Sequence, residues 1–481
     1  MLITLECVIL ALQAVAAVRL ALESPFETTG QSSNRLSKRS PVELSGDFGQ
    51  CYRMKSNVNG VSLNLLVDSA MSDIIMPLPS SSDDVGLNPR HTPNGQPVAI
   101  EYKGEEYRGV SSNADVTIPG TRITGINLPV IAVEKQSADI VGIHPRFDGI
   151  FGFGYTSLSK HHSPATAMDI LYTNDVIPNN EIGLQLCPYG MLSDSFINIG
   201  NTDVTAKCGT DGRSVAWVDS PSDDQFSINI KSILVNDEPV ELPAEFQKKV
   251  ENGRTLYSSV ETCSAYIHLP ETVVATLINA ILDSGAITSK SILFKNKLGK
   301  IMVKINLQGN FLISKFDFKI DWDKMPSLTI TMHAETPVTD DNRNSVVAIK
   351  LGPKDYIQRY DSEDCKYLTI MFIVTAGSND YAILGRSFMT RLGLTFDRAH
   401  KRIGFGPGCG CEVATSDYPT ISDHYRVLWP LTQLPEQPST SGSDGAFIRR
   451  RRPTTTTDQV AVPENTHHAV KSHKQTLNKL D

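Results

Sequence analysis

Short runs in which apolar and polar residues alternate recur between about residue 48 and residue 410. Successive side chains of a β-strand point to opposite faces, so this alternation is typical of strands with one buried face. Clusters rich in Gly, Asn, Asp and Pro, which favour turns, separate the runs. The clearest runs are residues 61–67 (VSLNLLV), 114–119 (ADVTIP), 128–133 (LPVIAV), 183–186 (GLQL), 227–235 (SINIKSILV), 301–307 (IMVKINL) and 328–332 (LTITM). The pattern predicts an all-β protein.

Signals for helices are few, and the strongest covers residues 270–282 (PETVVATLINAIL). A proline stands at its start, and its apolar residues recur at helical spacing. We therefore expect one clear helix there.

The pattern changes at both ends of the chain. An apolar run over residues 8–18 is too short to span a bilayer and ends in small residues, which predicts a signal peptide over residues 1–17. The polar residues 18–39 end in Lys38-Arg39, which is consistent with a short pro-segment or with a solvated charge pair. Residues 431–481, which include the run Arg449 to Arg452, contain almost no aromatic residue, and we expect a disordered tail. No membrane anchor is expected, so we predict secretion or a place in the lumen of the secretory or endolysosomal pathway.

The 481 residues are 40% hydrophobic and carry a formal net charge of −8. Such a chain can bury a sizeable core but offers no broad basic field, which argues against a nucleic-acid partner. We predict no metal and no other cofactor, because the pair His161-His162 lacks further spaced ligands and the cysteines of residues 406–411 (GPGCGC) favour disulfide chemistry.

The chain contains an internal echo. Residues 65–77 (LLVDSAMSDIIMP) and 259–270 (SVETCSAYIHLP) both run from apolar residues through an acid and small residues to proline. Each is followed at a distance by two apolar residues and a glycine, at 150–152 and 383–385. The echo places Asp68 and Glu261 on matched turns. Two carboxyl groups close together share a proton, so one acts as base and the other as acid on a water between them.

With these motifs the chain resembles a pepsin-family aspartic protease, most closely the β-secretase branch, over residues 48–425. Further residues that carry the resemblance are 101–119 (EYKGEEYRGVSSNADVTIP), 148–155 (DGIFGFGY), 182–187 (IGLQLC), 381–389 (YAILGRSFM) and 394–406 (LTFDRAHKRIGFG). The resemblance implies a bilobal fold with pseudo-twofold symmetry, lobes over 40–206 and 207–430, a hairpin flap over the central cleft, and peptide-bond hydrolysis. It also implies a monomer with a peptide or protein in the cleft.

The resemblance assigns roles to several further residues. Tyr102 matches the flap tyrosine, and Tyr107 stands where this branch has a tryptophan that holds it. In the branch the cysteine of the LQLC motif pairs with one just past the strand of residues 402–405 (RIGF), which implies a disulfide from Cys187 to Cys409 or Cys411. No partner is evident for Cys263, so we expect a free thiol acting as a small buried hydrophobe.

Both turns depart from the family pattern of Asp, Thr or Ser, Gly, and Ser or Thr. The first reads Asp68-Ser69-Ala70-Met71: Ser69 keeps the hydroxyl that ties the two turns together in the family, Ala70 adds a Cβ in a tight place, and Met71 removes a hydroxyl. The second reads Glu261-Thr262-Cys263-Ser264, in which Thr262 and Ser264 fit the pattern. Glutamate moves its carboxyl group outward by one methylene, roughly 1.3–1.5 Å. A misplacement of about 1 Å costs on the order of a hundredfold in rate.

Asp283-Ser284-Gly285 also matches the family pattern. A helix end with a glycine cap is the better account of these residues, with a shifted alignment as the alternative.

Two functions therefore compete. The protein is either an acid-acting endopeptidase in which Asp68 and Glu261 flank the water, or a pseudopeptidase that binds peptides or proteins without cutting them. The four substitutions in the two turns favour impaired catalysis.

Overall fold

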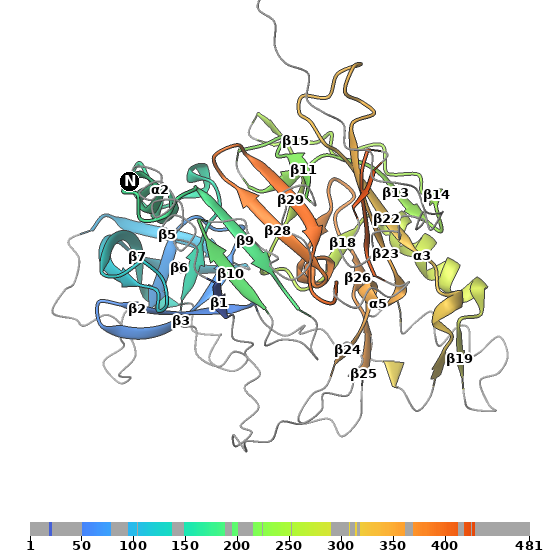
Figure 1. Cartoon of the computed structure of the whole chain (residues 1–481), viewed down its shortest axis with the longest axis horizontal. Helices are drawn as coiled ribbons and strands as arrows, with labels where there is room; N and C mark the ends of the chain where they lie inside the picture. Colours follow the sequence, from blue (N-terminus) through green and yellow to red (C-terminus); the bar gives the residue numbers. More distant parts are fainter. Residues whose placement is uncertain are drawn as a thin grey trace, which may run out of the picture. The chain divides into compact units, whose positions relative to one another are not determined.

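The structure is a computed structural model. It describes residues 19–21, 51–77, 95–102, 104–136, 149–187, 195–200, 215–223, 225–251, 253–289, 307, 313–314, 318–360, 369–411, 418–424 and 426–428. The expected signal peptide, nearly all of the expected pro-segment and the tail after residue 431 lie outside these residues. Strands dominate the described part of the chain (Figure 1), which confirms the all-β, pepsin-like prediction.

A seven-stranded sheet organises the amino-terminal half. The second strand of this sheet shows the predicted alternation, because Leu63, Leu65 and Val67 are buried while Ser62, Asn64 and Leu66 are less so. This strand ends at Asp68 and runs parallel to the strand that ends at Gly152. The sheet order is β2 (Arg53–Val58), β3 (Val61–Asp68), β8 (Ile150–Gly152), β4 (Ile74–Pro77), β7 (Ile126–Gln136), β6 (Glu105–Thr117) and β5 (Pro97–Tyr102).

The carboxyl-terminal half repeats the central part of this arrangement. There β17 runs parallel to β27 and β18 lies antiparallel to it, just as β3 runs parallel to β8 and β4 lies antiparallel to it. The predicted echo is therefore a repeat of the backbone as well as of the sequence. The sheet order is β12 (Ser227–Ile228), β17 (Ser258–Val260), β27 (Ile383–Leu384), β18 (Ile267–Leu269) and β26 (Val374–Ala376).

A third sheet joins the two halves. Its central pairing is antiparallel between β9 and β28, and Figure 1 shows β9 and β10 beside the hairpin of β28 and β29. Aromatic rings from both halves meet in the common core, where Phe226 lies 5.9 Å from Phe153 and 4.7 Å from Phe396 between ring centroids. The sheet order is β1 (Arg19–Ala21), β10 (Phe196–Ile199), β9 (Glu181–Gln185), β28 (Leu392–Asp397), β29 (Arg402–Pro407) and β11 (Ala216–Asp219).

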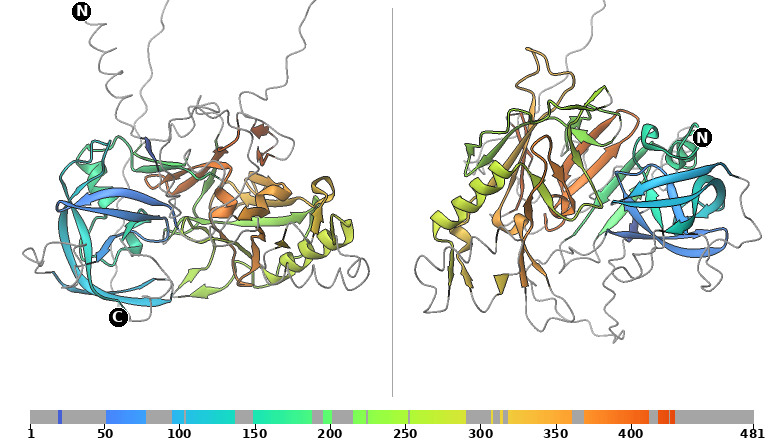
Figure 2. Two further views of the ribbon diagram at one scale, coloured as in Figure 1. Left: turned by 90° about the horizontal axis from the view of Figure 1, so that it is seen from below. Right: turned by 180° about the vertical axis from the view of Figure 1, so that it is seen from behind.

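The predicted helix is α3 (Glu271–Ser284), the yellow-green helix in both views of Figure 2. Pro270 precedes it, its apolar face is buried, and it packs against β13 (Ile230–Val235) and β26. It ends at Gly285, whose φ of 64° is the left-handed conformation that glycine adopts most readily. Asp283 is exposed in its last turn, so the shifted alignment is wrong.

The remaining elements flank these sheets. The other helices are η3 (Thr156–Leu158), α2 (Ala167–Thr173), η6 (Trp322–Lys324), α5 (Pro353–Tyr356) and α6 (Arg386–Met389). The other strands are β13 (Ile230–Val235), β14 (Glu238–Pro239), β15 (Val250–Glu251), β16 (Arg254–Thr255), β19 (Ile287–Ser289), β20 (Ile313–Ser314), β21 (Phe318–Ile320), β22 (Leu328–His333), β23 (Val346–Leu351), β24 (Ile357–Tyr360), β25 (Thr369–Phe372), β30 (Thr420–Asp423) and β31 (Arg426–Leu428). Among the described helices, none is long and apolar enough to cross a bilayer.

Candidate active site

A closed ring of hydrogen bonds joins the two predicted turns. The Ser69 amide donates to Thr262 Oγ1 over 2.9 Å, and the Thr262 amide donates to Ser69 Oγ over 3.0 Å. The Ser69 hydroxyl also donates to the Val260 carbonyl at 3.0 Å, and the Thr262 hydroxyl donates to the Val67 carbonyl at 2.8 Å. Both side chains are buried, so every donor in the ring has an acceptor away from water. The residues that follow Asp68 and Glu261 are thereby held in contact.

Asp68 is buried at the end of β3 with both carboxylate oxygens engaged. The Ala70 amide donates to Oδ1 at 2.8 Å, and the Tyr102 hydroxyl donates to Oδ2 at 2.8 Å. Burial, the Asp68 charge and this hydrogen bond raise the pKa of Tyr102 far above its ordinary value. The raised pKa means that the Tyr102 hydroxyl keeps the proton that it donates to Asp68.

Tyr102 comes from the end of β5, and the adjoining strand supports its ring. Tyr107 on β6 is buried, and its ring centroid lies 6.5 Å from that of Tyr102 at an interplanar angle of 60°. Tyr107 packs in a small apolar cluster with Ile100 and Ile131, against which Tyr102 and Met71 also pack. This arrangement suits the supporting role that the sequence implied for Tyr107.

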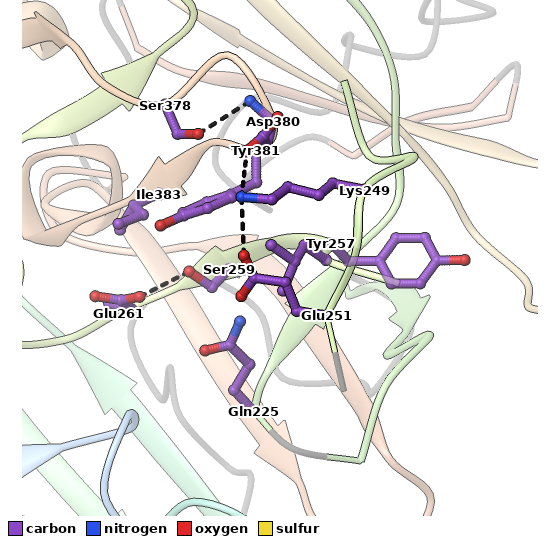
Figure 3. Close-up of a pocket in the computed structure, with 11 residues that line it drawn as sticks. Gln225, Lys249, Glu251, Tyr257, Ser259, Glu261, Ser378, Asp380, Tyr381 and Ile383 are labelled. Atoms are coloured by element: carbon purple, nitrogen blue, oxygen red, sulfur yellow. Dashed lines mark hydrogen bonds and ion pairs between the residues drawn. The ribbon is translucent and has the colours of Figure 1, made fainter. Parts of the chain in front are cut away.

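Glu261 lies directly after β17, and its carboxylate is bonded along its own strand. The Ser259 hydroxyl donates to Oε1 of Glu261 at 2.8 Å (Figure 3). Residues two apart on a strand share a face, which is why Ser259 reaches the glutamate. Glu261 also lines a cavity of about 300 Å³ whose walls all come from residues 225–383. In this cavity Lys249 forms ion pairs with Glu251 at 2.8 Å and with Asp380 at 3.1 Å.

The substituted residues of the first turn lie against the glycine-rich segment after β8. The Gly154 amide donates to the Met71 carbonyl at 2.6 Å, and Ala70 is only partly buried. A Cβ on Gly152 would lie 2.6 Å from the Met71 carbonyl carbon, so these backbones approach closely. Met71, where the family pattern has a hydroxyl, packs against the apolar cluster that contains Tyr107.

Cys263 corrects one expectation. It is not a free thiol but is bonded to Cys51, with 4.8 Å between their Cα atoms. The Val67 amide donates to the Tyr52 carbonyl at 3.0 Å, so the start of β2 lies beside the end of β3 and hence beside the joined turns. The two cysteines are separated by 212 positions in the sequence, so no local pattern indicated that they are neighbours.

The second disulfide resolves an open choice. Cys187 after β9 is bonded to Cys409 after β29, with 5.5 Å between Cα atoms. Cys411 is also disulfide-bonded, and its partner lies outside the described residues. The antiparallel pairing of β9, β28 and β29 brings the ends of these strands together.

Arg386 was not singled out from the sequence. It is buried at the start of α6, and its amide donates to the Ser264 carbonyl at 2.8 Å. Its charge acts to lower the pKa of Tyr102, against the larger effects of burial and Asp68. A Cβ on Gly385 would lie 2.3 Å from the Tyr266 carbonyl oxygen, so the glycine lets this segment reach the second turn. The sequence signal that could have drawn attention to Arg386 is its position directly after Gly385, the last residue of the second apolar-apolar-glycine motif.

Within the described residues, no group of three or more His, Cys, Asp or Glu side chains is arranged to hold a metal ion.

Two matched turns joined by a hydrogen-bonded ring, on a β fold with an internal repeat, define the class of two-carboxylate peptidases. The sequence profile of the family described as eukaryotic aspartyl protease matches residues 90–408, and the chain belongs to this family. A β-secretase from Strongylocentrotus purpuratus is 21% identical over 406 residues, covering 79% of this chain and 71% of the relative. The family match confirms the predicted pepsin-like family, and the second match confirms the predicted likeness to β-secretases.

Proposed function

We propose that this member of the aspartyl protease family binds peptide or protein segments in its cleft and hydrolyses them poorly. One observation carries the proposal: each carboxylate is engaged by a side chain of its own half of the chain. Asp68 accepts from Tyr102, and Glu261 accepts from Ser259.

The chemistry of the family explains why this arrangement impairs hydrolysis. Two carboxylates must share a proton and hold one water between them. The Tyr102 hydroxyl occupies the hydrogen-bonding position at Oδ2 of Asp68, and the longer side chain of Glu261 reaches back toward Ser259. The water therefore has a poor place between the two groups, and positional errors of about 1 Å cost on the order of a hundredfold in rate.

The intact ring between Ser69 and Thr262 favours a second candidate, an active acid endopeptidase. In that function Asp68 and Glu261 flank the water, and Tyr102 moves from Asp68 onto the bound peptide. The substitutions Ala70, Met71, Glu261 and Cys263 weigh against it because they alter both turns at once.

Binding and cleavage are separable by experiment. We expect calorimetry to detect a peptide that carries a hydroxyl group in place of the scissile carbonyl, while an unfolded protein is cut at a negligible rate. Asp68→Asn should weaken binding of this peptide by about 10-fold or more, because a hydrogen bond to a charged partner is lost. Asp283→Asn, which alters an exposed carboxylate at the end of α3, is the matched control and should leave binding unchanged. Failure of the wild type to bind any such peptide would contradict the proposal.

The disulfides support a secreted or lumenal location, since such bonds persist in oxidising compartments. We propose cleavage of the signal peptide after residue 17, lobes over residues 40–206 and 207–430, and a monomer. Peptide mapping of protein recovered from the medium of eukaryotic cells tests the first point, and retention in the membrane pellet would count against secretion.

A further inference from the structure

The Cys51–Cys263 disulfide crosses from one half of the molecule to the other at the candidate active site. Cys263 stands two residues after Glu261, at a position where the family pattern has glycine. Cys51 lies two residues before the start of β2 in the amino-terminal sheet. Both cysteines are buried, at 2% and 6% exposure for Cys51 and Cys263, so the bond lies beneath the turns and not on the surface.

The amino-terminal end of this bond is firmly held. Tyr52 accepts a hydrogen bond from the Val67 amide, and its hydroxyl donates to the Cys187 carbonyl at 2.9 Å. Cys51 is therefore anchored to the strand that carries Asp68. The bond fastens the turn of Glu261 to the same strand.

The disulfide differs in kind from the hydrogen-bonded ring beside it. Each hydrogen bond of the Ser69–Thr262 ring is worth little net free energy, since water replaces it when the turns separate. A covalent bond between Cys51 and Cys263 prevents that separation altogether. At the position where the family pattern has glycine, this chain therefore has a cysteine whose disulfide holds the turn to the amino-terminal half.

We propose that the Cys51–Cys263 disulfide is a positioning element: it holds the turn of residues 261–264 against the amino-terminal lobe and so fixes the floor of the cleft. When the bond is absent, the turn opens locally and peptides bind more weakly, because the cleft must then be ordered on binding. The binding part of this proposal rests on the proposed function, but the local opening does not.

The second disulfide supplies a matched control. Cys187–Cys409 also joins the two halves of the chain, and its sequence separation of 222 is close to the 212 of Cys51–Cys263. Cys187 and Cys409 lie after β9 and β29 and belong to neither turn, although the Cys187 carbonyl accepts the hydrogen bond from Tyr52. Loss of either disulfide increases the conformational entropy of the unfolded chain by a similar amount. A difference between the two variants therefore reports the local effect of each disulfide in the folded protein.

The test compares Cys51→Ala/Cys263→Ala with Cys187→Ala/Cys409→Ala. Hydrogen exchange read by mass spectrometry follows the amides of residues 258–266, and calorimetry follows the hydroxyl-bearing peptide. We expect both variants to melt at lower temperature. The Cys51→Ala/Cys263→Ala variant alone should exchange these amides about 10-fold faster or more, and bind the peptide about 10-fold more weakly or more.

Equal exchange in the two variants would overturn the proposal. A wild type that binds no peptide would contradict the proposed function, while the exchange comparison would still decide the role of the disulfide.

If the alanine variants do not fold, dithiothreitol is titrated into the wild type. It gives two electrons and two protons to the disulfide, which becomes two thiols, and is itself oxidised to a cyclic disulfide. Alkylation then measures how much of each bond remains. Exchange at residues 258–266 should follow loss of Cys51–Cys263, and exchange that follows only Cys187–Cys409 would refute the proposal.

Discussion

The Tyr102 hydroxyl donates a hydrogen bond of 2.8 Å to Oδ2 of Asp68. The tyrosine that we propose as the flap residue thereby contacts the carboxylate that we propose as catalytic. Under the proposal of an active endopeptidase, this oxygen faces the water and the substrate, and Tyr102 leaves Asp68 before hydrolysis. The hydrogen bond therefore couples the position of Tyr102 to the hydrogen bonding of the Asp68 carboxylate.

Tyr102→Phe should lower the free energy of unfolding by about 1.5–3 kcal/mol, because the Asp68 carboxylate loses a donor in a buried place. Urea denaturation measures the change. Tyr172→Phe removes a hydroxyl from a tyrosine that is 44% exposed, and it should change stability by less than about 0.5 kcal/mol. Equal effects of the two substitutions would show that the Tyr102–Asp68 bond contributes nothing.

Thr262→Val tests the ring that joins the two turns. Valine keeps the shape of threonine but leaves the buried Ser69 amide without its acceptor and the Val67 carbonyl without its donor. Each orphaned group costs about 1–3 kcal/mol, so we expect a large loss of stability. Thr276→Val is the control, since that hydroxyl lies on the exposed face of α3. A Thr262→Val variant as stable as its control would contradict the account of the ring.

Removal of either disulfide should destabilise the protein to a similar extent. Bridges that close loops of 212 and 222 residues each contribute about 5 kcal/mol in the chain-entropy model. Urea denaturation of the two double-alanine variants measures both losses. A loss below about 1 kcal/mol for either variant would be inconsistent with this estimate.

The lowered pKa of Asp169 predicts how the free energy of unfolding depends on pH. Burial opposes its ionisation, but the Arg398 charge and the hydrogen bonds from Arg398 and Thr166 hold the pKa of Asp169 well below its ordinary range. Because the folded pKa lies below the unfolded value of about 3.9, the stabilisation is full above that pH and declines as the pH falls through it. The stability difference between wild type and Asp169→Asn should therefore be largest near about pH 6 and shrink below about pH 4.

Chemical denaturation across this pH range checks the prediction, with the exposed Asp175→Asn as control. A difference that grows as the pH falls would have the wrong sign. The Arg398–Asp169 pair, at 2.8 Å, links α2 to the turn after β28, so it also connects the two halves of the chain.

The sequence predicted correctly those features whose neighbours in space are also neighbours in the sequence. The α3 helix and the matched turns at Asp68 and Glu261 fall in this class, because strand alternation, a leading proline and a capping glycine are all local signals. The Cys51–Cys263 bond depends on the folded chain placing the start of β2 beside the second turn, so no local pattern predicts it. The burial of Arg386 was missed for the same reason. The hydrogen bond from Ser259 to Glu261 joins residues two apart, and it was missed because it depends on a side-chain rotamer.

The central claim is that Glu261 is a poorly placed remnant of a catalytic aspartate. Its most direct test is kcat/KM for one unfolded protein substrate between about pH 3.5 and 6, measured on the wild type and on Glu261→Asp, which leaves the disulfide at Cys263 intact. We predict that the wild type is at least ~10²-fold slower than Glu261→Asp, or than that variant with Ala70→Gly and Met71→Ser added. Rapid cleavage by the wild type that is abolished by both Asp68→Asn and Glu261→Gln would contradict the claim, because it would make Glu261 a working catalyst.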